Sequence, residues 1–133
     1  MQALMTPVDF VNRAVGVPWV KWRSDWRGMD CFGCVVLWFR EVLGVEVGPV
    51  PQMDIEAGFH SLPQWRECEP EAGATVWMAW RDGAPTHCGI LLDARRVLHA
   101  EGGEGKPGAV RVTRLSALQR VYGEAKFYRY SPC

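Results

Sequence analysis

Residues 28–44, GMDCFGCVVLWFREVLG, predict the central helix of this protein. Asp30 is a residue type that commonly caps a helix N-terminus, and Gly44 is typical of a residue that ends one, so we expect the helix over residues 31–43. The segment is apolar on almost every side, at Phe32, Val35, Val36, Leu37, Trp38, Phe39 and Val42. A helix without a polar face is usually buried, so this one is expected to lie in the core.

The segments before and after this helix are less regular. Residues 7–14 predict a short helix, because valines recur at helical spacing behind Thr6, a good cap, and Pro7 suits the first helical position. A tryptophan-rich loop is expected over residues 18–29. Several prolines interrupt residues 45–73, which predict a long and partly irregular excursion.

Short strand patterns separated by turn residues occupy the rest of the chain, at 74–80, 86–92, 96–100, 109–113 and 126–130. The glycine-rich stretch 101–108 predicts a loop, and residues 115–121 predict a short helix. Helices followed by antiparallel strands indicate the α+β class, here with the central helix packed on a five-stranded antiparallel sheet. A length of 133 residues is typical of one domain, which we expect over residues 1–133.

The composition argues against several classes of function. The formal net charge is zero and the basic residues are not clustered, so no nucleic-acid-binding surface is expected. The sequence has no apolar run long enough to predict a membrane span. Residues 1–10 lack the features of a secretory signal, so we expect synthesis in the cytoplasm without export. Five cysteines in such a chain favour reactive or metal-bound thiols over a disulfide framework.

Cys31 is the first candidate for chemistry, because it follows the predicted cap and lies in the first helical turn. There the unpaired N–H groups and the helix dipole stabilise a thiolate, which is the nucleophilic form. The same N–H groups could hold the oxyanion of a tetrahedral intermediate. A buried cysteine without chemistry is the alternative at such a position.

His87 and His99 are the second and third candidates, twelve residues apart on consecutive predicted strands. A hairpin centred on Asp93 would set the two directly opposite each other on one face of the sheet. A turn centred half a residue away would place them on opposite faces. On one face, His87 could accept the proton of Cys31 while His99 fixes its tautomer.

Three motifs resemble those of the NlpC-type cell-wall cysteine peptidases. Residues 28–33, GMDCFG, resemble their Gly-aromatic-Asp-Cys-Ser-Gly motif; residues 87–91, HCGIL, resemble their His-Val-Gly-Ile-Tyr strand; and residues 97–100, VLHA, resemble their Val-Ile-His-Ala strand. The family also places its third catalytic residue twelve after its histidine. Pro18 and Trp19 stand where the family usually has Pro and Tyr. The resemblance covers most of the chain, from about Pro18 to Ala100.

This resemblance implies a papain-like fold and hydrolysis of amide bonds in peptidoglycan stem peptides, usually after D-glutamate. It implies catalytic roles for Cys31, His87 and His99, without a cofactor or a metal. Trp19, Asp30 and Phe32 are the candidate substrate-binding residues beside the nucleophile. The sequence departs from the family pattern at Trp19, at Phe32, at 21–23 (KWR for Trp-Gly-Gly) and at 73–74 (GA for Gly-Asp), which leaves the exact substrate open.

The chain is also similar in length to small members of this family carried by bacteriophage tail tips. That likeness implies synthesis in the bacterial cytoplasm, a place in the virion tail tip, and tail hub or tail-tip proteins as partners. A lysis pathway through a holin is an alternative route to the cell wall.

Other functions remain open from the sequence. Cys31 and Cys34 form a Cys-x-x-Cys pair, which could be a redox dithiol or, with Cys68 and Cys88, a metal site. A structural tail subunit on an inactive peptidase fold is a third alternative. A lipid acyltransferase of the same superfamily normally has its histidine before its cysteine, so the order found here disfavours that function.

Overall fold

A computed structural model describes residues 4–47, 65–73, 75–103 and 105–130. Two helical segments and a small hairpin come first: α1 (Pro7–Ala14), β1 (Ser24–Asp25), β2 (Gly28–Met29), α2 (Cys31–Trp38) and the π-helix η1 (Phe39–Leu43). The other described residues form a sheet and a helix: β3 (Trp65–Glu67), β4 (Val76–Arg81), β5 (Ala84–Leu91), β6 (Arg96–Gly103), β7 (Lys106–Arg114), α4 (Leu115–Tyr122) and β8 (Ala125–Tyr130). The α+β class is confirmed.

The central helix begins and ends as the sequence predicts. The Asp30 side chain accepts a hydrogen bond from the N–H of Gly33, and Gly44 adopts a left-handed φ of 68° at the C-terminal end. The last turn widens into η1, which the sequence pattern does not reveal. Every residue of α2 except Cys31 is buried, so the expectation of a core helix is confirmed.

α1 also forms as predicted and packs beside α2. Thr6 caps it by accepting from the N–H of Asp9 at 3.1 Å, and Pro7 occupies the first turn. Phe10 is fully buried, and its ring centroid lies 5.1 Å from both Trp26 and Trp38. The predicted tryptophan-rich loop therefore contributes a core ring, and it contains the two short strands β1 and β2.

Within the described residues the sheet has six antiparallel strands, in the order β3-β8-β4-β5-β6-β7, where the sequence analysis predicts five. The strand that was missed is β3, a three-residue edge strand in the proline-interrupted region. Its pattern is too short to show alternation, because only Trp65 points inward while Arg66 and Glu67 are exposed. Most of the predicted excursion, residues 48–64, lies outside the described part of the chain.

The glycine-rich stretch 101–108 was predicted to be a loop, and this is wrong. β6 runs to Gly103 and β7 begins at Lys106, with Glu101 paired to Ala109. The glycines let other groups approach closely: a Cβ on Gly102 would lie 2.7 Å from that of Trp19, and the Gly108 backbone abuts Glu101. Glycine here marks close packing within a strand pair instead of a break in it.

The outer edge of β7 is covered by residues 16–19. Pro18 forms a bridge with Ala109, and the N–H of Trp19 donates to the Gly108 carbonyl at 2.9 Å. Val110 exchanges two more backbone hydrogen bonds, accepting from Gly16 and donating to Val17. The segment after α1 thus pairs with the edge of the sheet through backbone hydrogen bonds, although it is not itself a regular strand.

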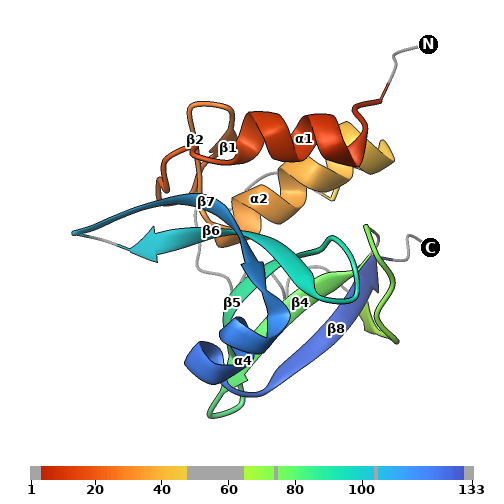
Figure 1. The fold of residues 1–133 in the computed structure, drawn as a ribbon, viewed down its shortest axis with the longest axis vertical. Coiled ribbons are helices and arrows are strands. Elements are labelled where there is room, and N and C mark those ends of the chain that lie inside the picture. Colours follow the sequence, from red (N-terminus) through yellow and green to blue (C-terminus); the bar gives the residue numbers. More distant parts are fainter. Residues whose placement is uncertain (1–3, 48–64, 74, 104, 131–133) are drawn as a thin grey trace.

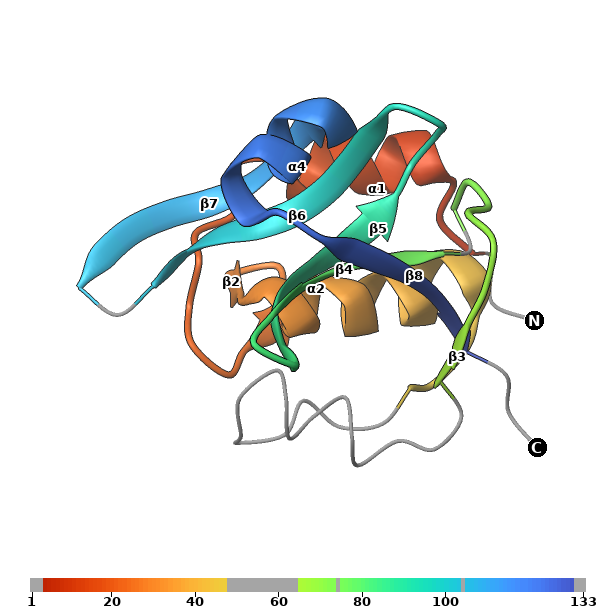
Figure 2. The ribbon, with the colours of Figure 1, turned by 90° about the horizontal axis from the view of Figure 1, so that it is seen from below.

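The two faces of the sheet have separate cores. One face packs on α2 through residues that include Met78, Ile90 and Leu98, and the other packs on α4 through Trp77, Leu91 and Leu118. Figure 1 shows α2 and α4 with the strands between them. β5 and β6 pair over a short ladder, Ile90 with Leu98 and Leu91 with Val97. The arm formed by β6 and β7 diverges from β4 and β5 on the side of the N-terminal end of α2 (Figure 2).

Candidate functional site

The N-terminus of α2 presents Cys31 with its backbone donors arranged around it. Asp30 accepts from Gly33 N–H through Oδ1 and from Trp22 N–H through Oδ2, each at 2.7 Å. The Cys34 N–H donates to the Asp30 carbonyl at 2.9 Å. The amides of Cys31 and Phe32 belong to the first turn, where a helix makes no hydrogen bonds of its own for them. These two donors are therefore available beside the thiol.

His87 and His99 contact each other on the α4 face of the sheet. His87 Nε2 lies 2.8 Å from His99 Nδ1, and His99 Nε2 lies 2.7 Å from Thr113 Oγ1. His87 is 6% exposed and His99 is fully buried. The two histidines share one face, as the sequence analysis expects. The contact with His99 uses His87 Nε2 and leaves the other ring nitrogen of His87, Nδ1, for a different partner.

The predicted turn of this hairpin is centred one residue too early, which puts the predicted pairing of the two strands off by two residues. Leu91 pairs with Val97, so the turn is centred on Ala94 and not on Asp93. The physical reason is the Asp93 side chain, which accepts from the N–H groups of Arg95 and Arg96 and thereby builds the turn from its first residue. Continued by one residue, the register sets Gly89 opposite His99, and His87 reaches His99 diagonally.

Gly89 makes the diagonal contact possible. A Cβ at this position would lie 2.5 Å from the Leu98 carbonyl oxygen and 2.9 Å from the Cβ of His99. No side chain fits there, so the space between His87 and His99 stays open for their rings. Glycine two residues after the histidine is therefore part of how the pair is assembled.

The Cys31 thiol lies against β5 at His87 and Cys88. Hydrogen bonding to the Cys88 side chain, together with the hydrogen bond to His87 and the charge of that ring, lowers the pKa of Cys31 well below its ordinary value, although burial opposes the shift. Burial, with the neighbouring Cys31, raises the pKa of Cys88. Cys31 is therefore the thiol of this pair that ionises, and Cys88 stays protonated as its hydrogen-bond donor.

Aromatic side chains from β4 and α4 hold the His87 ring. Tyr122 stacks on it, with ring centroids 4.7 Å apart and an interplanar angle of 14°, and Trp77 packs edge-on at 5.7 Å. The Tyr122 hydroxyl donates to Glu101 at 3.1 Å. His87 is thus fixed in orientation on several sides, which a proton-transfer group requires.

His99 stays neutral in this environment. Burial, the charge of His87 and the charge of Arg111 lower its pKa from 6.5 to about 3. A neutral ring has one nitrogen that accepts a hydrogen bond and one that donates, so His99 Nδ1 can accept a hydrogen bond from His87 Nε2–H without becoming charged. The arrangement of Cys31, His87 and His99 is one that could supply a nucleophile, a base and an orienting group.

The sequence matches the model of the NlpC/P60 family over residues 16–124, which include all three of these side chains. This chain belongs to the NlpC/P60 family. The members of that family are cysteine peptidases and hydrolases. The crystal structure of the NlpC/P60 domain of the peptidoglycan hydrolase SagA has a similar fold, with a TM-score of 0.63 and 19% identity over 92% of this chain and 93% of that one. No curated protein is significantly similar in sequence.

The three predicted substrate-binding residues of this NlpC/P60 chain differ in how they are placed. Trp19 is half-buried and packs over Gly102 on the β6–β7 arm. Both carboxylate oxygens of Asp30 accept from backbone amides, and burial raises its pKa to about 6. Phe32 is 5% exposed and belongs to the core beneath the sheet. Of the three, Phe32 has the least surface to offer a ligand.

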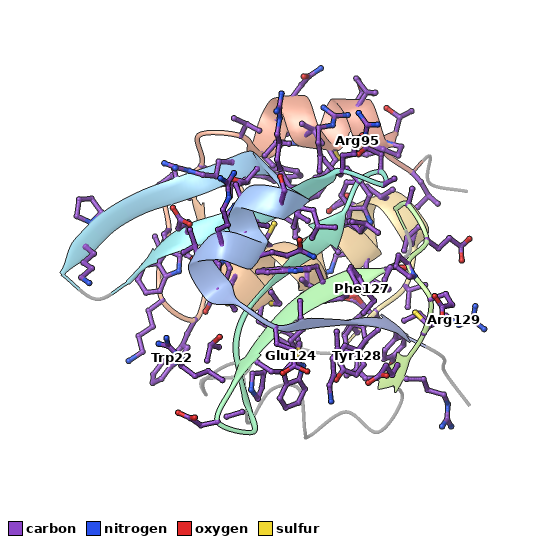
Figure 3. The ribbon with its side chains drawn as sticks, turned by 60° about the horizontal axis from the view of Figure 1, so that its bottom comes forward. Trp22, Arg95, Glu124, Phe127, Tyr128 and Arg129 are labelled. Atoms are coloured by element: carbon purple, nitrogen blue, oxygen red, sulfur yellow. The ribbon has the colours of Figure 1, made fainter. Side chains whose placement is uncertain are left out.

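Trp22, which stands in the KWR departure from the family pattern, has a conformation unusual for its type. Its φ is 59°, a left-handed value that favours glycine, and its side chain is 42% exposed. Figure 3 shows Trp22 at the periphery of the molecule. The backbone N–H of Trp22 donates a hydrogen bond to the Asp30 side chain, which fastens this loop to the start of α2.

The geometry argues against the dithiol alternative. Cys34 is fully buried, and burial with the neighbouring Cys31 raises its pKa to about 12, so it cannot supply an attacking thiolate. Cys31, Cys34, Cys68 and Cys88 are free thiols. Within the described ranges, no three His, Cys, Asp or Glu side chains gather as metal ligands, and no helix there is long and apolar enough to cross a membrane.

The sequence analysis did not identify Thr113, Tyr122 or Trp77 as neighbours of the histidines. Thr113 could have been found from the pairing of β6 with β7, since His99 lies opposite Arg111 and a residue two further along shares its face. Tyr122 could not, because its contact depends on how α4 folds back over the sheet.

Proposed function

We propose that this protein is a cysteine peptidase that hydrolyses amide bonds in the stem peptides of peptidoglycan. Cys31 is the nucleophile, His87 transfers the proton, and His99 orients His87. The observation that carries the proposal is the continuous contact from the Cys31 thiol through His87 to His99, with 2.8 Å between the two histidine rings.

In the acylation step, Cys31 Sγ attacks the carbonyl carbon of the scissile amide and its proton goes to His87. The tetrahedral intermediate carries a negative oxygen, for which the free amides of Cys31 and Phe32 are the nearest helix donors. Collapse of the intermediate breaks the C–N bond, and His87 returns the proton to the leaving amine.

In the deacylation step, a water molecule attacks the thioester while His87 accepts one of its protons. The thioester C–S bond then breaks, the peptide leaves as a carboxylic acid, and His87 returns the proton to Cys31. His87 must therefore act twice per turnover, as base and then as acid, whereas His99 remains neutral throughout.

The family and the motifs support peptidoglycan as the substrate. The SagA domain, similar in fold, belongs to a peptidoglycan hydrolase, and the motif resemblance implies cleavage after D-glutamate. Incubation with purified peptidoglycan, followed by mass analysis of the released fragments, tests this proposal. We expect new amine and carboxyl ends in the stem peptide, lost in Cys31→Ala and retained in Cys68→Ala, whose thiol lies next to β3 instead of the site.

We propose further that the protein is made in the bacterial cytoplasm and assembled into a phage tail tip, against tail hub or tail-tip proteins. The support is the likeness to small phage members of the family that also have a substituted residue after the nucleophile, here Phe32. Mass spectrometry of purified virions tests it. Presence in lysates but never in particles would favour the holin route, and presence in particles without hydrolysis would favour a structural subunit.

A further inference from the structure

Three polar side chains form a diagonal line across three adjacent strands. His87 lies on β5, His99 on β6 and Thr113 on β7, and each contacts the next at 2.8 Å and 2.7 Å. Both ring nitrogens of His99 are used by these contacts. His99 is fully buried, so Thr113 Oγ1 is its hydrogen-bond partner on the side away from His87.

We propose that Thr113 is a positioning residue that selects the tautomer of His99 and, through it, the protonation of His87. This inference rests on the proposed function, because it assigns Thr113 a role in the same proton transfer. Thr113 itself does not touch Cys31 or the substrate. When His99 carries its proton on Nε2, the Thr113 hydroxyl oxygen accepts that N–H, and His99 Nδ1 is then the acceptor that faces His87.

The activated form of the site requires this arrangement. When Cys31 is a thiolate and His87 is an imidazolium, both ring nitrogens of His87 carry protons. The His87 Nε2–H must then point at a lone pair, which His99 offers only if its own proton is on Nε2. In the opposite tautomer, His99 Nδ1–H would face His87 Nε2–H, and the imidazolium would lose its partner.

The charged groups around His99 offer no substitute for the threonine. Arg111 lies on β7 directly opposite His99. It is a cation that can only donate hydrogen bonds, and its guanidinium forms an ion pair with the Glu101 carboxylate at 3.5 Å. Glu101 in turn accepts from Tyr122, the residue stacked on His87. With Thr113 removed, a buried Nε2–H on His99 would have no acceptor, which is costly, so His99 would favour the other tautomer.

Thr113→Val keeps the shape of the side chain and removes the acceptor. We expect peptidoglycan hydrolysis to fall about ten- to hundredfold and the pKa of Cys31, measured by alkylation rate against pH, to rise by about one unit. Thr113→Ser should restore both. Thr86→Val is the matched control, because the exposed Thr86 on β5 bonds only the Ala79 carbonyl, at 3.4 Å.

Side-chain nitrogen NMR reads the tautomer directly, and only three histidines have to be assigned. We expect the neutral Nε2–H form of His99 in the parent protein and the Nδ1–H form in Thr113→Val. In a His99→Asn background, Thr113→Val should cost less than about threefold, since an amide has no tautomers to select.

The possible outcomes separate the two proposals. An unreactive Cys31 in the parent protein would overturn the proposed function. A reactive Cys31 with an unchanged His99 tautomer in Thr113→Val, no rescue by serine, or an equal loss in the His99→Asn background would overturn the role of Thr113 alone.

Discussion

At the scale of the residue, the site divides its work between two histidines of different environment. His87 contacts the thiol and is slightly open to solvent, while His99 is sealed behind it and held neutral. In the proposed mechanism His99 must not gain a proton, and burial and neighbouring charge are what keep it neutral.

This difference predicts unequal effects of substitution. His87→Ala removes the proton-transfer group and should abolish turnover, whereas His99→Asn keeps an acceptor for His87 Nε2–H and should retain part of it. Hydrolysis rates of the two purified variants at neutral pH provide the measurement. Equal losses would mean that the roles of the two histidines have been misassigned.

Gly89 predicts a second residue-scale effect. Gly89→Ala puts a Cβ 2.5 Å from the Leu98 carbonyl, so the strands must shift and the His87–His99 contact must lengthen. We expect a loss of about 1–3 kcal/mol in the free energy of unfolding and a lower kcat. Gly103→Ala on β6 is the control, since a Cβ there meets nothing within 4 Å. Unchanged activity in Gly89→Ala would refute the spacing role of this glycine.

At the scale of the element, α2 depends on a cap that also anchors the preceding loop. Asp30→Ala removes the hydrogen bonds from Gly33 and Trp22, and should lower the free energy of unfolding by about 1–2 kcal/mol. The activity should fall with it, because the first turn positions Cys31. Thr6→Ala, the corresponding cap of α1, should cost about 1 kcal/mol without changing kcat. Urea titration and steady-state kinetics separate these outcomes.

The elements also show how far sequence reasoning reaches. The capped, apolar α2 and the Cys-His-His spacing were predictable, because each depends on local chemistry at Asp30, Gly44 and the strand pattern. The register of β5 and β6 was not predictable. It depends on which backbone amides the Asp93 side chain accepts from, here those of Arg95 and Arg96, and this sets the centre of the turn. β3 was missed because its pairing with β8 is set by tertiary contacts, such as Trp65 against Tyr130 at 5.3 Å between ring centroids.

At the scale of the whole molecule, the buried neutral histidine makes stability depend on pH. Unfolded His99 titrates near 6.5 and folded His99 near 3, so between these values the unfolded chain binds the extra proton. His99 therefore causes stability to fall as the pH drops from about 6.5 towards 3, by a few kcal/mol at most. Asp30 acts in the opposite sense between 3.8 and about 6, because its folded form holds the proton more tightly.

The contribution of His99 to the pH dependence of stability is measured by comparing the parent protein with a His99 variant. Denaturation midpoints of the parent protein and of His99→Asn should diverge in slope between pH 6.5 and pH 4, with the variant losing less stability on acidification. Parallel curves over that range would show that His99 is not held neutral in the folded protein.

The residues that cover β7 have a consequence for solubility. A sheet edge with open N–H and C=O groups templates pairing with other chains, and β3 at the far edge limits this by being short and charged. β7 is long, and residues 16–19 occupy its outward groups at Gly108 and Val110. Gly16→Pro removes the donor to Val110 and cannot adopt a φ of 94°, so it should free this edge and promote self-association visible by light scattering. Gly105→Pro, strained in the same way at the hairpin tip, should leave the protein monodisperse, which would identify residues 16–19 as its guard against aggregation.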